Sequence, residues 1–252
     1  MSEIEGRALR VCALYPDLMN IYADRGNLLV LERRCSWRGI GFQLSASGLG
    51  ESLDGSAHDI YYIGGGQDRD QLLCAEDLVA GKREGLHQAA ARGAVVLGVC
   101  GGYQLLGESY TLGERRLQGV GLLDVRTVRE PGSRLIGNVA IEVHLDGCGD
   151  AREKRVLAGF ENHGGRTYLG RDAIALGRVI KGHGNDGHSG FEGARADHVI
   201  GTYLHGPLLP KNAWFADWLI ATALGVDLGA LLPLDDALES EAHVSARRAA
   251  GL

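Results

Sequence analysis

The stretch with the clearest chemical potential is AVVLGVCGGYQLLG, residues 94–107. An apolar segment runs into Cys100, two glycines follow at once, and a helical pattern begins. Gly98-Val99-Cys100-Gly101-Gly102 has the form of a nucleophile elbow, in which glycines permit a sharp strand-to-helix turn. Such a turn would place Cys100 at a helix N-terminus, where unpaired amides favour the thiolate, lower its pKa and can stabilise an oxyanion. We therefore interpret Cys100 as a candidate nucleophile.

His205 is the histidine best placed to serve as the base that a nucleophilic cysteine needs. It follows the apolar segment HVIGTYL, at the C-terminal edge where α/β enzymes place their chemistry. A histidine at a strand end can also be purely structural, so its position alone leaves both interpretations open. Other histidines lie in patterns typical of the surface (His58, His87, His243), of strand alternation (His144) or of a glycine-rich stretch (His183, His188, His198).

The composition bounds the class of protein. The chain has 252 residues, of which 45% are hydrophobic and 23% charged, as expected for a globular protein with a sizeable core. A formal net charge of −6 and the lack of a basic run argue against a nucleic-acid partner. No segment has the apolar length of a membrane span, and MSEIEGRALR lacks the apolar core of a secretory signal. We therefore expect a cytoplasmic protein.

The cysteines indicate neither a disulfide framework nor a metal site. There are five, an odd number, widely spaced and without a C-x-x-C pair. The four besides Cys100 are interpreted as structural: Cys12, Cys35, Cys74 and Cys148.

The first half of the chain must supply the elements that position Cys100. Short apolar segments alternate with helical patterns, as in an α/β fold with right-handed crossovers. The segment 94–99 is apolar on both faces, which is typical of a central strand in a parallel sheet. Strands are predicted at 8–15, 41–46, 58–66 and 94–99, and helices at 27–39, capped by Asn27, and at 68–93.

The second half is richer in strands and shows no linker, repeat or low-complexity tract. We therefore expect a single domain over residues 1–252, with a helix-favouring but solvated tail from Leu234. Strands are predicted at 120–128, 134–145, 156–162, 174–182 and 198–206, and a helix at 211–224.

Several motifs together resemble a known family. GVCGGYQLLG with GTYLHGP resembles the cobyric-acid-synthase-like branch of the class I glutamine amidotransferases. The stretches LYPDLMNIYADRGNL, YYIGGGQD, RLIGNV and GFENHGGRTYLG narrow the resemblance to glutaminase subunits of that branch that act in peptidoglycan synthesis. The resemblance runs from about residue 10 to about residue 215. It implies an open three-layer, flavodoxin-like α/β fold with a mostly parallel central sheet.

The resemblance also implies roles for individual residues. Cys100 corresponds to the nucleophile and His205 to the general base of glutamine hydrolysis. The glycine turn GGGQD, through Gly65 and Gly66, would form the oxyanion hole with the amide of Gly101. Arg134 would hold the carboxylate of the substrate glutamine, although a surface arginine at a strand start is the alternative.

Five further residues in these motifs have less specific interpretations. Glu161, Asn162 and His163, in the FENHGG stretch, could border the glutamine site or belong to a turn. Asp24 and Asn27, in the N-terminal signature, are interpreted as loop and helix-cap residues.

The sequence lacks a recognisable synthase half. There is no G-x-x-x-x-G-K-[ST] motif, and the G-x-G-x-x-G match at 182–187 is not followed by a helical pattern. The resemblance implies that this chain binds no cofactor and forms a heterodimer with a Mur-ligase-like partner subunit. ATP and Mg²⁺ would bind to the partner, which would amidate the D-glutamate of a lipid-linked stem peptide. Two alternatives remain: a glutaminase for another synthase, such as a cobalamin-type enzyme, and a non-catalytic regulatory subunit.

The third member of the catalytic triad is missing from its usual place. In most class I amidotransferases a glutamate follows the base by two residues, but here that position is Pro207. An acid elsewhere in the chain, such as Glu161, could substitute. We favour an acid from the ligase subunit, which would complete the triad only in the complex.

Overall fold

The central feature of the computed structural model, which describes residues 4, 6–21, 24–112, 114–145 and 155–252, is a six-stranded sheet. Its strand order is β13-β14-β4-β3-β1-β2, and only the β13–β14 pair is antiparallel. The predicted mostly parallel α/β sheet is therefore confirmed. Its strands are β1 (Ala8–Leu14), β2 (Gly41–Ser47), β3 (Ile60–Ile63), β4 (Val95–Val99), β13 (Ala194–Ala196) and β14 (Val199–Thr202).

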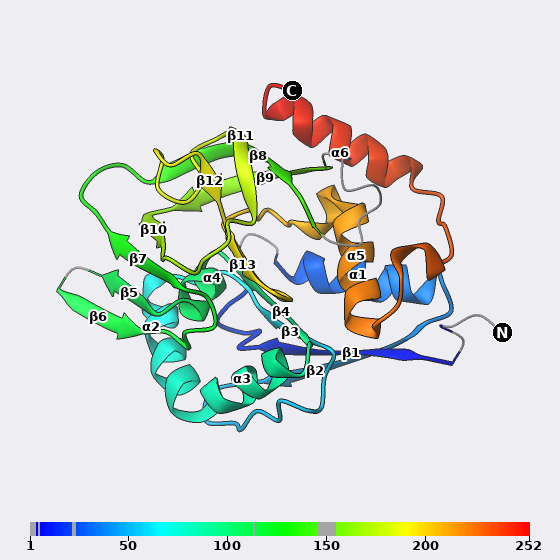
Figure 1. Ribbon diagram of the computed structural model, residues 1–252, viewed down its shortest axis with the longest axis horizontal. Coiled ribbons are helices and arrows are strands. Elements are labelled where there is room, and N and C mark those ends of the chain that lie inside the picture. The colour runs from blue at the N-terminus through cyan, green and yellow to red at the C-terminus, as the bar shows by residue number, and fades with distance from the viewer. Residues whose placement is uncertain (1–3, 5, 22–23, 113, 146–154) are drawn as a thin grey trace.

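Helices cover both faces of this sheet, which explains why β4 is buried along its whole length. Figure 1 shows α1 and α5 packed together on one face, with α2 and α3 on the other. None of the helices within the described ranges combines the length and apolarity needed to cross a membrane. The α-helices are α1 (Arg25–Ser36), α2 (Asp68–Asp77), α3 (Arg83–Ala91), α4 (Gly101–Leu106), α5 (Ala213–Leu224) and α6 (Ala237–Ala249); η1 (Leu78–Lys82) is a π-helix, and η2 (Leu209–Lys211) and η3 (Leu228–Ala230) are 3₁₀-helices.

The single helix predicted over 68–93 is interrupted by the π-helix η1. The buried Lys82 amine pairs with the carboxylate of Asp77 and lies 4.8 Å from the centre of the Tyr15 ring. A π-helical turn changes the direction of side chains within a helix. The widened turn thus places Lys82 against the partly buried Asp77 and the buried ring of Tyr15, and apolar spacing does not reveal the contact with the distant Tyr15.

The second half of the chain adds two smaller sheets, of order β10-β7-β5-β6 and β12-β11-β8-β9. The second is antiparallel throughout, and β8 and β9 pair over nine residues. The strands are β5 (Ser109–Leu112), β6 (Arg115–Gln118), β7 (Val125–Arg129), β8 (Leu135–Val143), β9 (Arg155–His163), β10 (Gly165–Leu169), β11 (Gly177–Lys181) and β12 (Phe191–Glu192).

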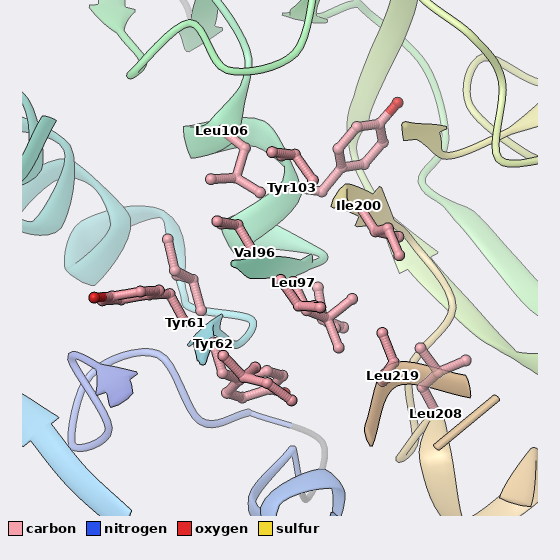
Figure 2. Close-up of a cluster of buried hydrophobic side chains, with 14 of the residues drawn as sticks. Tyr61, Tyr62, Val96, Leu97, Tyr103, Leu106, Ile200, Leu208 and Leu219 are labelled. Atoms are coloured by element: carbon pink, nitrogen blue, oxygen red, sulfur yellow. The ribbon is translucent and has the colours of Figure 1, made fainter. Parts of the chain in front are cut away.

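A buried apolar cluster ties the central sheet to the helices around it. Figure 2 shows side chains of β3, β4, α4, β14 and α5 gathered in one core. Tyr103 of α4 and Ile200 of β14 belong to it and are fully buried. This packing fixes the turn between β4 and α4, where Cys100 lies.

The tail is helical, as its composition indicated, and none of the side chains of α6 is buried. It is nevertheless fastened to the body of the molecule. Asp236 pairs with the buried Arg34 at 2.8 Å, and the ring of His243 contacts the carbonyl oxygen of Lys211 at 2.8 Å. The Nδ2 group of Asn138 donates to the carbonyl oxygen of Ala249 at 2.9 Å. In Figure 1 this helix lies across the sheet that contains β8 and β9.

Candidate active site

Cys100 lies on a strained turn at the C-terminal end of β4. Its backbone has φ 53° and ψ −105°, a region that residues other than glycine rarely adopt. Its amide donates to the carbonyl oxygen of Thr202 in β14 at 2.8 Å. A Cβ at Gly102 would lie 2.2 Å from the carbonyl oxygen of Ile63, so only glycine fits there. The close approach of α4 to β3 therefore explains part of the glycine pattern around the cysteine.

The thiol of Cys100 is protonated at rest. Burial, with the negative charge of Asp24 as a second cause, raises the pKa of this thiol to about 12. The Gly101 amide and the Arg134 guanidinium act in the opposite direction, but they are outweighed. The predicted lowering of the Cys100 pKa is therefore wrong. Burial destabilises the thiolate by more free energy than the nearby amide and guanidinium groups recover.

His205 follows β14, the strand next to β4 in the sheet. Thr202 pairs with Val99 in parallel, which brings the ends of the two strands to the same edge. An antiparallel bridge fixes the backbone of His205 to Phe160, with N–O distances of 3.0 and 3.1 Å. Burial lowers the pKa of His205 to about 4, and positive charge from neighbouring side chains acts in the same direction. The imidazole is neutral at pH 7 and can accept a proton.

The glycine turn after β3 lies against the Cys100 turn. A Cβ at Gly65 would be 3.3 Å from the Cβ of Cys100, and one at Gly101 would be 3.0 Å from the amide nitrogen of Gly66. The amide of Gly65 donates to Asp24 Oδ2 at 2.6 Å. The structure therefore brings all three predicted glycines to the cysteine, but the amide of Gly65 is already bonded to a carboxylate.

Arg134 lies at the start of β8 and is fastened by Asn162 of the neighbouring strand β9. Its Nε and Nη2 groups donate to the side-chain oxygen and to the carbonyl oxygen of Asn162, both at 2.7 Å. Its charge lowers the pKa of both Cys100 and His205, so it acts electrostatically on both candidate catalytic groups. The sequence identified Arg134 and left Asn162 open between the glutamine site and a turn, because the pairing of β8 with β9 that joins the two residues is not visible in the sequence.

Glu161, which the sequence offered as an internal triad acid, is engaged elsewhere. Both of its carboxylate oxygens accept backbone amides, from His183 at 2.6 Å and from Gly184 at 2.9 Å. Its Oε2 also lies 4.0 Å from His163 Nε2. The glycine-rich turn at 182–187 thus binds an acid of its own chain through its amides.

The N-terminal signature holds two residues whose roles were not apparent in the sequence. Asn27 does not cap a helix: it lies inside α1, where it accepts from the Leu209 amide at 2.8 Å and donates to the Tyr62 hydroxyl at 2.9 Å. Asp24 is fully buried beside the glycine turn. Asp and Asn are both preferred residues at helix starts, so the types of Asp24 and Asn27 alone did not reveal these contacts.

In the described ranges, no group of three or more His, Cys, Asp or Glu side chains is arranged to hold a metal ion. Cys12, Cys35, Cys74 and Cys100 are free and buried, and Cys148 lies outside the described residues.

The model of the CobB/CobQ-like glutamine amidotransferase domain matches residues 10–213. The chain belongs to this family. Two similar relatives are named "Lipid II isoglutaminyl synthase (glutamine-hydrolyzing) subunit GatD". That of Streptococcus pneumoniae is 37% identical over 217 residues, 86% of this chain and 80% of the relative. That of Staphylococcus aureus is 39% identical over 208 residues, 82% of this chain and 81% of the relative.

A solved glutamine amidotransferase from Thermotoga maritima has a similar fold. Its TM-score is 0.51 at 16% identity, over 97% of this chain and 94% of that one. Both candidate catalytic segments, around Cys100 and around His205, lie inside the residues that match this family. These matches confirm the family and the fold that the sequence motifs predicted.

Proposed function

We propose that this chain is the glutaminase subunit of a lipid II isoglutaminyl synthase, hydrolysing glutamine to glutamate and ammonia. The observation that carries the proposal is the position of Cys100 and His205 just after the ends of two adjacent parallel strands, in a chain of this family. The names of the two relatives support the part of the proposal that assigns this glutaminase to a lipid II isoglutaminyl synthase.

The hydrolysis uses groups that the fold brings to one edge of the sheet. Neutral His205 takes the thiol proton, and the sulfur of Cys100 attacks the side-chain amide carbon of glutamine. Backbone amides of Gly66 and Gly101 stabilise the oxyanion, and protonated His205 gives its proton to the departing ammonia. Water then hydrolyses the glutamyl thioester, which releases glutamate and restores the thiol.

Arg134 binds the α-carboxylate of the glutamine in this proposal. Asn162 occupies the edge of the guanidinium formed by Nε and Nη2. The opposite edge, formed by Nη1 and Nη2, is left for a two-pronged contact with the substrate carboxylate. Asn162 thus supports the arginine in the orientation that binding requires.

The ammonia passes to a partner subunit that activates the acceptor. We propose a MurT-like Mur ligase subunit that binds ATP and Mg²⁺ and amidates the D-glutamate of the lipid II stem peptide, in a heterodimer with this chain. This chain itself would use no cofactor. Because the partner consumes ATP, the complex would work in the cytoplasm, on the inner face of the membrane.

The partner would also supply the acid that orients His205. Pro207 stands where most class I amidotransferases have a glutamate, and Glu161 is bound by the turn at 182–187. A carboxylate from the ligase subunit would stabilise the imidazolium that forms after thiol deprotonation. Hydrolysis of glutamine would then be fast only in the assembled complex, which suppresses futile loss of ammonia.

The test is reconstitution with the ligase subunit. We expect very weak glutaminase activity from the isolated chain, a large increase on adding the partner, and glutamine-dependent amidation of lipid II by the complex. Equal glutaminase activity with and without the partner would contradict the shared triad. Copurification with a cobalamin-type synthase would favour that alternative, and an assembled complex without glutaminase activity would indicate a regulatory subunit.

A further inference from the structure

We propose that Asp24 is a positioning residue that holds the glycine turn 64–66 in the conformation that stabilises the oxyanion. The inference rests on the proposed glutaminase function and deepens it. It concerns a buried carboxylate that touches none of the reacting atoms in the mechanism above.

The contacts of Asp24 reach the turn directly. Its Oδ2 accepts the amide of Gly65 at 2.6 Å, and its side chain is fully buried. A Cβ at Gly65 would lie 3.2 Å from Asp24 Oδ2 and 3.3 Å from the Cβ of Cys100. Gly65 is therefore packed between Asp24 on one side and the nucleophile on the other.

A hydrogen bond from Ile21 fixes the next peptide unit of the turn. The amide of Ile21 donates to the carbonyl oxygen of Gly65 at 3.2 Å. In a trans peptide the carbonyl and the following N–H point in opposite directions, and the described chain has no cis peptide. Since the carbonyl of Gly65 points to Ile21, the N–H of Gly66 points away from it. The Gly66 nitrogen lies 3.0 Å from the position of a Cβ on Gly101, beside the cysteine.

The start of α1 also contacts the loop that carries His205, the proposed base. The Asp24 carbonyl oxygen accepts the amide of Asn27 at 2.9 Å, and Asn27 Oδ1 accepts the amide of Leu209 at 2.8 Å. A Cβ at Gly26 would lie 2.8 Å from Pro207. The start of α1 thus braces both the glycine turn and the chain after His205.

A buried carboxylate with so few partners is costly to keep. Asp24 Oδ1 is buried and has no hydrogen-bond partner among the described residues. Burying such an oxygen opposes folding. Helix capping does not account for it, since no side-chain bond from Asp24 caps α1. What the buried position of Asp24 makes possible is its hydrogen bond to the Gly65 amide, which holds the glycine turn beside the nucleophile.

The test compares two substitutions in the complete complex with its ligase subunit. Asp24→Ala removes the acceptor, and we expect kcat for glutamine hydrolysis to fall at least tenfold with KM changed less than twofold. The reason is that a displaced oxyanion donor reduces stabilisation of the transition state but leaves the binding of the ground-state substrate unchanged. Asp24→Asn keeps a carbonyl oxygen for the Gly65 amide and should restore most of the lost kcat. Affinity for glutamate γ-semialdehyde, whose hemithioacetal with Cys100 places an oxygen in the hole, should fall with kcat.

Asp59→Ala is the matched control. Asp59 also accepts a backbone amide, that of Arg10 at 2.9 Å, but it precedes β3 at the opposite edge of the sheet. We expect this variant to keep the wild-type kcat. Ammonia-dependent amidation reports whether each complex is folded and assembled. If Asp24→Ala does not assemble, Asp24→Leu fills the space without offering an acceptor and replaces it.

Three outcomes would overturn the inference: an unchanged kcat in the variants without an acceptor, a rise in KM in place of a fall in kcat, or an Asp24→Asn variant as slow as Asp24→Ala. A wild-type complex without glutaminase activity would instead refute the proposed function. The two failures are therefore distinguishable.

Discussion

At the scale of single residues, the candidate site holds two neutral groups that must exchange a proton. Burial raises the pKa of the Cys100 thiol to about 12 and lowers that of His205 to about 4. Both shifts oppose the thiolate–imidazolium pair that attacks the substrate. Charges of the bound substrate and of the proposed partner would stabilise this pair, as the proposed completion of the site on assembly requires.

Replacing the nucleophile should separate the two halves of the reaction. We expect Cys100→Ala to abolish glutamine-dependent amidation and to leave ammonia-dependent amidation intact, because the proposed ATP site is on the partner. The measurement is amidation by the complex with glutamine or with ammonium as nitrogen donor. Loss of both activities in an assembled complex would show that Cys100 has another role.

Removing the proposed carboxylate-binding arginine should weaken substrate binding. Arg134→Ala loses a charge-assisted contact worth roughly 1.5–3 kcal/mol, so KM for glutamine should rise about ten- to a hundredfold. Steady-state kinetics of the complex measure this change. The control is Arg178→Ala in β11, which removes an arginine packed over the ring of Phe191 in β12 and should leave KM unchanged. If the two variants behave alike, Arg134 is only a surface residue.

At the scale of elements, the sequence predicted the strands that carry the site but not the contacts between elements. The apolar runs that became β1, β3, β4 and β14 are buried along almost their whole length, which is why their pattern was clear. The hairpin of β5 and β6 was not predicted, since SYTL and RRLQ are short and largely polar. The π-helix, the role of Asn27 and the placement of Asp24 depend on residues distant in sequence, which local patterns do not encode.

The turn between β4 and α4 offers a direct test of how these elements position the nucleophile. Gly102→Ala places a Cβ 2.2 Å from a backbone oxygen of β3, so we expect a loss of stability of about 1–3 kcal/mol and a lower kcat. Urea unfolding and glutaminase assays measure both. Gly81→Ala in η1 is the control, because nothing lies within 4 Å of its added Cβ. It should be neutral or slightly stabilising. A stable, active Gly102→Ala variant would contradict the packing described for α4.

At the scale of the whole molecule, buried carboxyl groups make stability depend on pH. Burial raises the pKa of Asp24 to about 7 and that of Glu192 to about 8. A carboxyl whose pKa is raised by folding stabilises the protein below its unfolded pKa, and this contribution is lost as pH rises through the folded value. His205, with a lowered pKa, acts oppositely and costs stability as pH falls from about 6.5 to about 4.

The carboxyl groups therefore predict a lower Tm at pH 8.5 than at pH 5.5. Glu192 accepts the Tyr203 amide at 2.6 Å beside β14, and Glu192→Gln keeps an oxygen for that contact without a titrating group. We expect the fall in Tm to be smaller in Glu192→Gln than in the wild type or in a control at the exposed Glu76. Thermal unfolding followed by circular dichroism measures the difference, and equal slopes in all three proteins would contradict it.

The burial of Cys100 also determines how the enzyme withstands oxidants. Peroxides attack thiolates far more readily than thiols, and oxidation beyond the sulfenic acid is irreversible for most cysteines. Cys100 is only 7% exposed and its thiol has a pKa of about 12, so the thiol stays protonated while no substrate is bound. We therefore expect oxidative inactivation of Cys100 to be slow while no substrate is bound. The burial that keeps the thiol protonated would thus also preserve the nucleophile between catalytic cycles.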